Sequence, residues 1–478
     1  MSQLSRRKFV QGSLAAAATV TLAGTKSSAK VLGASDTIRV AVAGLNGRGG
    51  AHVSALAGMK GVQVVCLVDP DTRTFDKRIK QVEKLGGNTP RTEQDIRRVL
   101  EDKSIDAVTV ATPNHWHAPI TIWACQAGKD VYVEKPCSHN VREGRVAVET
   151  ARKHHRIVQH GTQSRSSSSW ARLAALARSG KLGKLLVSRA LCYKPRGSIG
   201  VKPTTAVPNE VNFDLWLGPA PTRDFHANLV HYNWHWFWDF GNGDIGNQGV
   251  HQMDVARWMI PGATLPRSVL SLGGRFGYKD QGQTPNTQLT FMDFGDTTLV
   301  FEVRGLKTGD LRGQKVGNVL EFEAGTVAGN KFYPKGSDKA ERVPDAGGGE
   351  RGPGGGIFGN FVAAVRSRKQ ADLDADILEG HYSSALCHLA NISYRLGGEV
   401  PFDPRSKALA GDPNVAEALG RMEEHLSKDN SVGLAGTTCR LGKRLTIDAK
   451  AEGIVGDAAA ARLLTREYRK PYTVPEKV

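Results

Sequence analysis

The sequence predicts an α/β fold of two domains: an N-terminal doubly wound parallel sheet, followed by an α+β domain with a large, mostly antiparallel sheet. Two observations predict it. Between residues 37 and 160, short apolar runs alternate with helix-like segments, which is typical of parallel strands joined by helices. After residue 165, strand-like segments follow one another with few helices between them. The 478 residues are enough for two or three domains.

The sequence of residues 1–34 predicts an export signal, and we do not expect this segment to belong to the folded domains. A charged stretch with Arg6 and Arg7 precedes an apolar run at 14–23, and the small residues at 27–29 form a candidate cleavage site. The paired arginines resemble a twin-arginine signal, which predicts export of the folded protein to the periplasm. An ordinary signal or a lipid-free anchor is the alternative. The run is far shorter than the ~20 residues that cross a bilayer, and we expect no membrane span elsewhere.

Residues 36–163 form the first predicted domain. Its expected strands are apolar or β-branched runs at 38–43, 62–68, 107–111, 130–134 and 157–160. Helices are expected between them, at 49–58, 71–85, 92–100, 115–127 and 141–154. Thr92 is the expected N-cap of the third helix.

Residues 164–400 form the second predicted domain, which we expect to bind the substrate. Its strands are expected at 186–193, 268–278, 287–294, 298–304 and 319–324, and its main helices at 248–260 and 376–396. The glycine-rich stretch 346–356 is expected to be a mobile loop. Residues 401–478 are a C-terminal elaboration whose pattern predicts no particular place in the fold.

Charge and cysteine content exclude several classes of protein. The net charge is +17, but lysine and arginine are scattered along the body rather than gathered in a stripe, which argues against nucleic-acid binding. None of the six cysteines is spaced as Cys-x-x-Cys. We therefore expect buried free thiols rather than a disulfide framework or a zinc site.

A glycine-rich turn follows the first strand and predicts a dinucleotide site. Gly44, Asn46 and Gly49 occupy the positions of a G-x-G-x-x-G turn, with asparagine in the middle and Gly47 beside it. Such a turn lets the backbone approach a pyrophosphate at a helix N-terminus, and asparagine tolerates positive φ best among the other residues. Asp69 ends the second strand, where a carboxylate would accept hydrogen bonds from ribose hydroxyls. These features predict a Rossmann domain that prefers NAD to NADP; a capped turn without a ligand is the alternative.

Two further motifs carry a resemblance. The segment 111–117, Ala-Thr-Pro-Asn-His-Trp-His, and the segment 133–136, Val-Glu-Lys-Pro, resemble motifs of the Gfo/Idh/MocA family of sugar oxidoreductases, and the likeness extends from 38 to 396. The resemblance implies that the cofactor is contacted by Thr112, Pro113, Asn114, His117, Glu134, Lys135 and Gln163. Two of these have simpler explanations, because Asn114 could cap the helix that it begins and His117 could be a surface residue.

The resemblance also implies a catalytic group. Lys135 ends a parallel strand, where open sheets bind their ligands, and its ammonium could stabilise a developing alkoxide. His251 would be the general base, since a histidine with a pKa near 6.5 suits that task. Asn247 stands where the family has aspartate, four residues earlier, so we expect both side chains on one helix face. A lysine directed to water and a histidine buried in the core are the alternatives.

Residues 231–240 are the most aromatic stretch of the chain and predict a carbohydrate platform. Trp234, Trp236, His235 and Asp239 could stack on a sugar ring and bind its hydroxyls, although core packing also explains aromatic residues. A metal triad of His231, His235 and Asp239 would need one helix face, and we expect no metal. Further candidate substrate contacts are Tyr193 and Arg196.

The sequence thus predicts an exported NAD(H)-dependent oxidoreductase that transfers hydride from a sugar, sugar acid or cyclitol. Free NAD is scarce outside the cytoplasm, so a retained cofactor is expected. One alternative is an NAD-dependent glycoside hydrolase or lyase that oxidises its substrate transiently. Another is a non-catalytic carbohydrate-binding protein that kept the fold. Resemblance to the family also implies a homo-oligomer formed through the open sheet of the second domain.

Overall fold

The computed structural model describes residues 37–403, 413–476 and 478 of the chain. The export signal predicted for residues 1–34 lies outside the described residues. The N-terminal sheet has the strand order β3-β2-β1-β4-β5-β6 and all its neighbours are parallel, which confirms the doubly wound prediction. Its strands are β1 (Ile38–Ala43), β2 (Val62–Val68), β3 (Arg91–Glu93), β4 (Ala107–Val110), β5 (Asp130–Val133) and β6 (Val158–His160).

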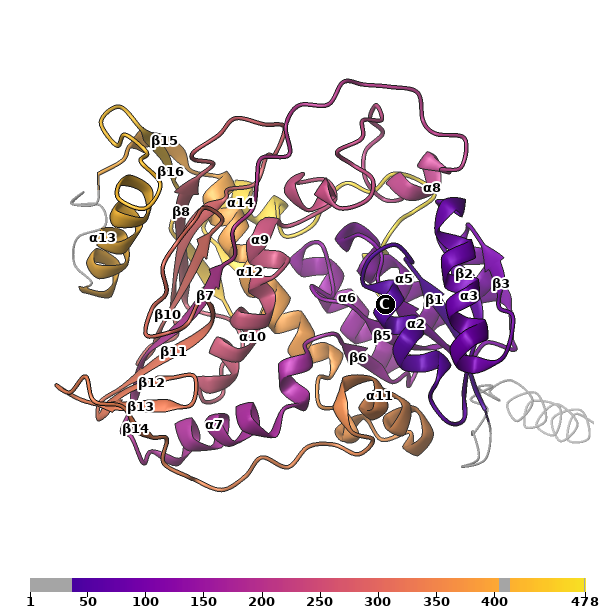
Figure 1. Cartoon of the computed structure of the whole chain (residues 1–478), viewed down its shortest axis with the longest axis horizontal. Helices are drawn as coiled ribbons and strands as arrows, with labels where there is room; N and C mark the ends of the chain where they lie inside the picture. The colour runs from indigo at the N-terminus through magenta and orange to yellow at the C-terminus, as the bar shows by residue number, and fades with distance from the viewer. Residues whose placement is uncertain (1–36, 404–412, 477) are drawn as a thin grey trace, which may run out of the picture. The chain divides into compact units, whose positions relative to one another are not determined.

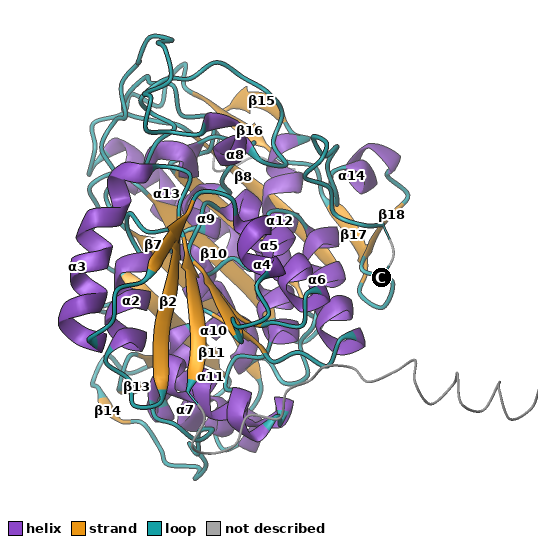
Figure 2. Ribbon diagram, turned by 90° about the vertical axis from the view of Figure 1, so that its right-hand side faces the viewer, coloured by secondary structure: helices purple, strands orange, loops and turns teal. Residues whose placement is uncertain are grey.

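Helices cover both faces of this sheet (Figure 2). On one side α2 (Gly49–Ala57) packs with α3 (Phe75–Gly86), and on the other α5 (Asn114–Gln126) packs with α6 (Val141–Lys153). The central strands β1, β4 and β5 are almost entirely buried, because a parallel sheet covered on both faces has no solvent-facing side.

Two predicted helix starts are wrong. Thr92 does not cap a helix but lies in β3, and the helix α4 (Ile96–Glu101) begins after Asp95, whose carboxylate accepts a hydrogen bond from Arg97 N at 3.0 Å. The helix expected at 71–85 begins only at α3. Before it, Asp71 caps the short 3₁₀ turn η1 (Thr72–Thr74). In both places an aspartate that bonds the backbone two residues ahead decides where the helical turn begins.

The second sheet holds twelve strands among the described residues. Its main order is β14-β13-β12-β11-β7-β10-β9-β8-β16-β15, while β17 pairs with β8 and β18. Only β7 and β10 pair in parallel among these, so the sheet is mixed but mostly antiparallel, as predicted. The strands are β7 (Leu185–Tyr193), β8 (Ser268–Gly274), β9 (Thr287–Asp293), β10 (Thr298–Arg304), β11 (Val316–Phe322), β12 (Gly325–Ala328), β13 (Lys331–Pro334), β14 (Glu341–Arg342), β15 (Gly398–Pro401), β16 (Thr438–Leu441), β17 (Leu445–Asp448) and β18 (Gly453–Val455).

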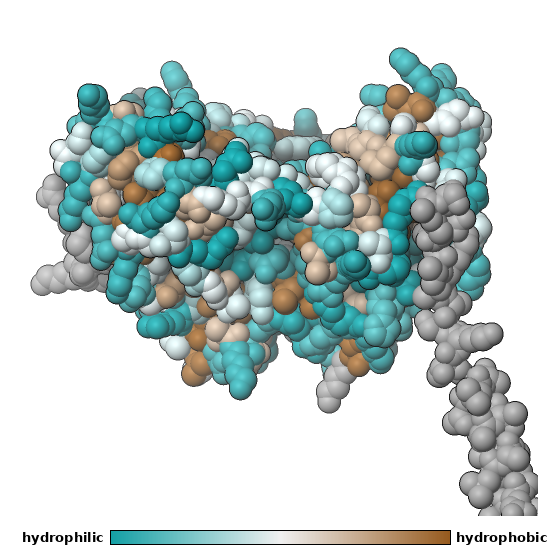
Figure 3. All heavy atoms as spheres, turned by 90° about the horizontal axis from the view of Figure 1, so that it is seen from below, coloured by the Kyte–Doolittle hydropathy of each residue, from teal (hydrophilic) through white to brown (hydrophobic). Residues whose placement is uncertain are grey.

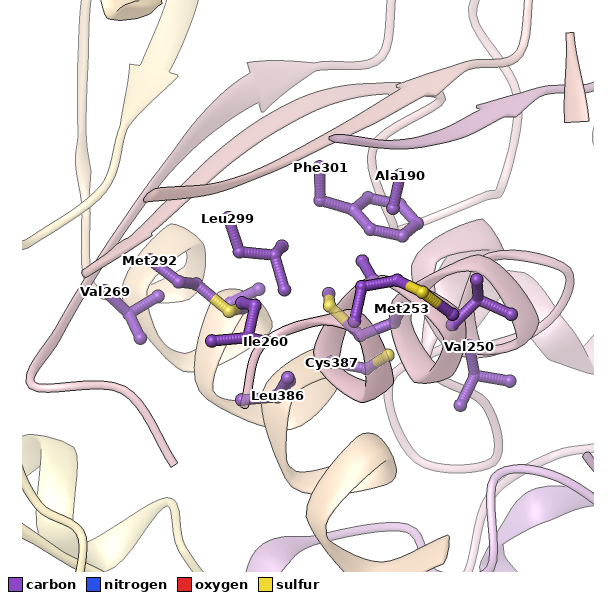
Figure 4. Packing of buried hydrophobic residues seen from close by; sticks show 14 of the residues in the cluster. Ala190, Val250, Met253, Ile260, Val269, Met292, Leu299, Phe301, Leu386 and Cys387 are labelled. Carbon is purple, nitrogen blue, oxygen red and sulfur yellow. The ribbon is translucent and has the colours of Figure 1, made fainter. Parts of the chain in front are cut away.

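A layer of helices separates the two sheets (Figure 1). It consists of α7 (Ser168–Ser179), α10 (Gly249–Met259) and α12 (Ile377–Arg395). Figure 4 shows Met253 on α10 and Cys387 on α12 beneath Phe301 of the sheet, in a cluster of buried residues. Because α12 packs against both β8 and α6, it joins the second sheet to the first domain. The remaining helices are α8 (Phe213–Leu217), α9 (Gly243–Gly246), α11 (Gly356–Ser367), α13 (Pro413–Ser427) and α14 (Ala458–Arg462), with 3₁₀ turns η2 (Gln163–Ser166), η3 (Asn233–Trp236) and η4 (Gln370–Asp372).

The outer face of the second sheet is partly covered by the chain itself. Leu419, Met422 and Leu426 of α13 pack with Phe291 and Val300 of the sheet in one buried cluster. This is the sheet through which we expected subunits to associate, and oligomerisation stays a prediction. Figure 3 shows another view of the surface, on which hydrophilic residues predominate and hydrophobic ones form small scattered groups.

The C-terminal segment links the two domains. After β16 and β17 extend the second sheet, the chain passes α14 and returns to the first domain, where Tyr472 is 2% exposed within the core around Trp116. The rings of Tyr472 and Trp116 lie 5.5 Å apart, and the Tyr472 hydroxyl donates to Asp214 at 2.7 Å. Among the described helices, none combines the length and apolar character that crossing a membrane requires.

Replacement of Tyr472 should therefore destabilise the first domain. We expect Tyr472→Ala to lower the free energy of unfolding by about 3–5 kcal/mol, the usual cost of deleting a buried aromatic ring. Tyr472→Phe keeps the ring and should cost only about 1 kcal/mol. Urea denaturation of both variants measures the difference. Equal stabilities of the two variants would show that the ring does not belong to the core.

Candidate active site

A cavity of about 250 Å³ lies at the carboxyl ends of the parallel strands, as expected for an open sheet. Residues from the second domain close its other side. The predicted residues that line it are Gly44, Asn46, Gly47, Asp69, Thr112, Pro113, Asn114, His117, Glu134, Lys135, Trp234, His235 and Asn247. The predicted residues that do not line it, all within the described part of the chain, are Gly49, Gln163, Tyr193, Arg196, Trp236, Asp239 and His251.

The glycine turn leaves no room for side chains at two positions. Gly44 has φ +83°, and a Cβ at Gly49 would lie 1.7 Å from the carbonyl oxygen of Gly44. The middle of the turn differs from our expectation of a positive φ, because Asn46 does not have one. Gly47 also has room for a side chain, since a Cβ there would meet nothing within 4 Å. The helix α2 begins at Gly49 without an acidic residue in its first turn, so no carboxylate of its own neutralises the positive end of its dipole.

The Arg78 side chain stabilises this turn, a role that the sequence analysis did not predict. The side chain reaches from α3 to donate hydrogen bonds to the carbonyl oxygens of Leu45 and Asn46, each at 2.8 Å. Sequence analysis expected a helix here but gave Arg78 no role, although this residue is only 9% exposed. The only signal would have been an arginine on the face that also carries the buried Val82.

Asp69 lies at the cavity edge where the ribose was expected. Its carboxylate accepts hydrogen bonds from Leu45 N at 2.8 Å and Asp71 N at 3.0 Å, which fixes its position beside the glycine turn. Burial raises the pKa of Asp69 to about 6. Across the cavity, His231 Nε2 lies 2.7 Å from Asp71 Oδ2, so a loop of the second domain is fastened next to this site.

Two polar atoms at the next strand end have no partner within the protein. Thr112 Oγ1 and Asn114 Oδ1 are buried and make no hydrogen bond, although both residues line the cavity. Asn114 does not cap its helix, because α5 begins at Asn114 itself and Pro113 occupies the cap position. Buried polar atoms nearly always find a partner, so these two oxygens fit a ligand that lies along the turn, as a dinucleotide would.

Glu134 is held by two basic residues rather than left free. Its Oε1 accepts from Arg48 Nε at 2.7 Å and lies 3.2 Å from His52 Nε2. Burial alone would raise the pKa of Glu134, but His52 and Arg48 hold it well below its usual range. The ionised carboxylate therefore ties the glycine turn to the end of β5.

His117 contacts the loop that follows the same strand end. Its Nδ1 lies 2.6 Å from the carbonyl oxygen of Pro136 and its Nε2 lies 2.8 Å from that of Thr112. The residue is buried, so it is not the surface histidine that sequence analysis left open. Both ring nitrogens face carbonyl oxygens, and the ring connects the two loops that carry Thr112 and Lys135.

Lys135 connects the two domains inside the cavity. Its Nζ donates to the backbone oxygen of Asn247 at 2.8 Å and lies 3.4 Å from Asn247 Oδ1. Burial lowers the pKa of Lys135 below its ordinary value, while the neighbouring Glu134 partly opposes this effect. The alternative in which this lysine points to water is therefore wrong.

Asn247 and His251 do not share one helix face as predicted. Asn247 lies in the break between α9 and α10, with φ −84° and ψ −85°, whereas His251 belongs to the first turn of α10. His251 is near Lys135, and burial, reinforced by that cation, lowers the pKa of His251 to about 3. Its side chain does not line the cavity.

Of the two candidate bases His235 and His251, only His235 lines the cavity. Its ring stacks on that of Trp234 at 3.6 Å, and its Nδ1 lies 2.6 Å from the carbonyl oxygen of Tyr232. Because a carbonyl can only accept, Nδ1 carries the proton of the neutral ring and Nε2 has the free lone pair. Burial lowers the pKa of His235 to about 3.

Four predicted substrate contacts lie elsewhere. Tyr193 faces the other side of the second sheet, where its hydroxyl donates to Glu302 at 2.6 Å. Arg196 forms a bidentate pair with Asp244 and lies over the ring of Trp236, behind the cavity wall. Asp239 belongs to a second cavity.

The three residues of the metal triad have other partners. His231 binds Asp71, His235 binds a backbone carbonyl and Asp239 pairs with Arg223. Gln163 begins η2 after β6 and also lies off the cavity. Conversely, the lining residues that the sequence did not single out as contacts include Arg48, Trp216, His231 and Tyr232.

The similarity of this chain to known proteins agrees with this geometry. Residues 38–162 match the Gfo/Idh/MocA profile described as an oxidoreductase family with an NAD-binding Rossmann fold, and residues 192–270 match the C-terminal alpha/beta domain of that family. scyllo-Inositol 2-dehydrogenase (NAD(+)) of Bacillus subtilis is 32% identical over 298 residues, which cover 61% of this chain and 74% of that protein. The chain belongs to the Gfo/Idh/MocA family. NAD is accordingly the cofactor of its Rossmann domain.

Other relatives match more narrowly. A glycosyl hydrolase family 109 protein of Shewanella pealeana is 34% identical over 122 residues. The match covers 25% of this chain, and this chain spans only 27% of that relative's length. Among solved structures, the WlbA dehydrogenase of Bordetella pertussis, in complex with NADH and UDP-GlcNAcA, has a TM-score of 0.55 at 18% identity. The match covers 75% of this chain and 97% of that one, and shows the same fold.

The glycine turn offers a matched test of cofactor binding in this Gfo/Idh/MocA protein. Gly49→Ala should weaken NADH binding by about tenfold or more, because overpacking of this kind costs about 1–3 kcal/mol. Gly58→Ala adds the same methyl group at the other end of α2, outside the cavity, where the nearest heavy atom lies 4.0 Å away, and should leave the affinity unchanged. Fluorescence titration with NADH measures both variants. Equal affinities would mean that the turn does not contact the cofactor.

Proposed function

We propose that this protein is an NAD-dependent oxidoreductase that acts on a hydroxyl group of a sugar, sugar acid or cyclitol. The observation that carries the proposal is that the Lys135 ammonium and the His235 imidazole line one cavity, beside the unpartnered oxygens of Thr112 and Asn114. The similarity to scyllo-inositol 2-dehydrogenase supports a polyol as the substrate class.

Lys135 would hold the reacting oxygen. An ammonium has three N–H donors, and the contacts with Asn247 leave at least one for a substrate hydroxyl. A cation there stabilises negative charge as the proton leaves that hydroxyl. The lowered pKa of Lys135 also makes its own proton easier to share with the oxygen. Bound NAD supplies the hydride acceptor.

His235 would take the hydroxyl proton, in place of the predicted His251. Both imidazoles are near Lys135 and are kept neutral by burial. His235 lines the cavity and has a free Nε2, because its Nδ1 proton is committed to the carbonyl of Tyr232. His251 would then contribute to the electrostatic environment of Lys135 rather than to the proton transfer.

Replacement of each residue tests these roles. We expect Lys135→Ala and His235→Ala to lower kcat/KM about 100-fold or more, the usual scale for acid–base groups, with little change in NADH affinity. His251→Ala is the matched control and should have a smaller effect. With a His235 pKa of about 3, the base stays neutral, so kcat at saturating NAD should not fall between about pH 7 and pH 5 as it would for an unshifted histidine. Saturating NAD is needed because Asp69, with a pKa of about 6, titrates in the same range.

Three results would contradict this assignment. Full activity of His235→Ala with loss in His251→Ala would return the base to His251. A fall in activity at acidic pH, with its midpoint near the ordinary histidine pKa, would show that the base is not a desolvated imidazole. Unchanged ligand binding and biological activity in both the Lys135 and His235 variants would support a non-catalytic binding protein instead.

A second candidate function is cleavage of a glycoside with a retained cofactor. The observation that favours it is Asn247, whose neutral side chain lies beside Lys135 where the family motif has a carboxylate. A neutral amide cannot place a negative charge near the reacting hydroxyl. Asn247 therefore assists net oxidation of the substrate less than a carboxylate would. The family 109 glycosyl hydrolases among the relatives support the same reading.

Cofactor turnover separates the two candidates. If the protein is a dehydrogenase, a polyol such as scyllo-inositol together with added NAD should give NADH in proportion to the polyol consumed. If it cleaves glycosides, the purified protein should carry NAD on denaturation and release sugar from a nitrophenyl glycoside without added cofactor. Accumulation of NADH with a free polyol would exclude the redox-neutral scheme, and its absence together with glycoside release would exclude the dehydrogenase.

A further inference from the structure

A second cavity of about 320 Å³ lies apart from the cofactor site and shares no lining residue with it. Five segments build its wall: the loop after β5, the loop at Pro221, the aromatic stretch with the residues just after it, the end of α12, and the C-terminal chain from the end of α14. The residues that matter here are His139, Trp238, Asn242, His388, Arg395 and Arg466.

Several buried polar atoms in this wall have no partner. Asn242 is 5% exposed and its Nδ2 makes no hydrogen bond, while its backbone oxygen is taken by Asn391. His388 is 3% exposed and its Nδ1 is also unpartnered. Unsatisfied atoms of this kind are rare in folded proteins, and here they lie in the wall of one cavity.

His139 adds a further donor. Arg466 Nη1 lies 3.3 Å from His139 Nδ1, and because a guanidinium can only donate, Nδ1 is the acceptor. Burial and the neighbouring Arg466 lower the pKa of His139, so the ring is neutral and carries its proton on Nε2. This Nε2 is buried and has no acceptor within the protein.

The charge of the wall is positive. Arg395, Arg462 and Arg466 line the cavity, and in the described chain none of them has a carboxylate within 4.0 Å. Two carboxylates, Asp239 and Glu467, also line it, but Asp239 pairs with Arg223 at 3.4 Å. The guanidinium of Arg395 lies 5.2 Å from the ring of Trp238 and makes no hydrogen bond to another residue that the structure describes.

We propose that this second cavity binds the oxyanion of an acidic saccharide, such as the carboxylate or sulfate of a sugar unit. Arg395 and Arg466 supply the charge, because a guanidinium fork matches an oxyanion in geometry. Asn242 and His139 supply neutral donors for the remaining oxygens of the ligand. Trp238 offers an apolar face at the same place, as saccharide sites commonly do.

The second cavity contains only part of the predicted substrate platform. Sequence analysis put Trp234, His235 and Asp239 into a single platform, whereas the structure divides this stretch between two cavities. A ligand in the second cavity would therefore not reach the reacting groups through these residues. The binding would be separate from the proposed chemistry at Lys135.

Isothermal titration of the full chain with glucuronate, sulfate and glucose tests the proposal. We expect glucuronate to bind and glucose, which lacks the charge, not to bind at the same concentration. Sulfate distinguishes the sources of the oxyanion: competition with glucuronate shows that the charge alone is recognised, and failure to compete shows that the sugar ring is needed. Both results support an oxyanion site.

Matched variants locate the binding. Arg395→Met should weaken glucuronate binding about tenfold or more, since a charge-assisted hydrogen bond is removed. Arg312→Met is the control, because Arg312 also lies over an aromatic ring, that of Tyr333, but does not line the cavity. Lys135→Ala should leave this binding unchanged.

The proposal has clear contrary outcomes. Three results would each overturn it: neither glucuronate nor sulfate binds, glucose binds as well as glucuronate, or the Arg395 and Arg312 variants lose glucuronate binding equally. Loss of glucuronate binding in Lys135→Ala with retention in Arg395→Met would place the anion in the cofactor cavity instead. That last result would leave the proposed oxidoreductase intact while removing the second site.

Discussion

The contact between Lys135 and Asn247 is the interaction on which the site depends. It joins the end of a parallel strand to a break between two helices of the other domain, and the cavity exists because these two points meet. Glu134 and His117 hold the lysine's strand end in place through partners on the neighbouring loops. The amine is thus positioned by a rigid frame, which is what rate acceleration by orientation requires.

Much of the fold could be predicted because its signals are local. Buried parallel strands read as continuous apolar runs, and the turn from Gly44 to Gly49 followed by Asp69 fixes the nucleotide half with few residues. The starts of α3 and α4 were misjudged because an aspartate close by offers the backbone a competing turn.

The site was harder to predict because it depends on long-range placement. Tyr193 was assigned to the cavity, but it ends a strand on which neighbouring side chains face opposite sides, and the sequence does not say which side is the inner one. The spacing of Asn247 and His251 predicted one helix face only if the helix were unbroken. The role of Arg78 could not be predicted from its helix face alone, since it depends on a turn more than thirty residues earlier.

The C-terminal segment gives the protein a property beyond stability. It belongs to the second sheet through β16 and β17, and then inserts Tyr472 and Val474 among helices of the nucleotide-binding half. Arg469 adds a bond from this segment to the carbonyl of Gly218, near the wall that Trp216 gives the cavity. The two halves can separate only if these contacts break, so we expect release of a nucleotide held between them to require loosening of the C-terminal segment.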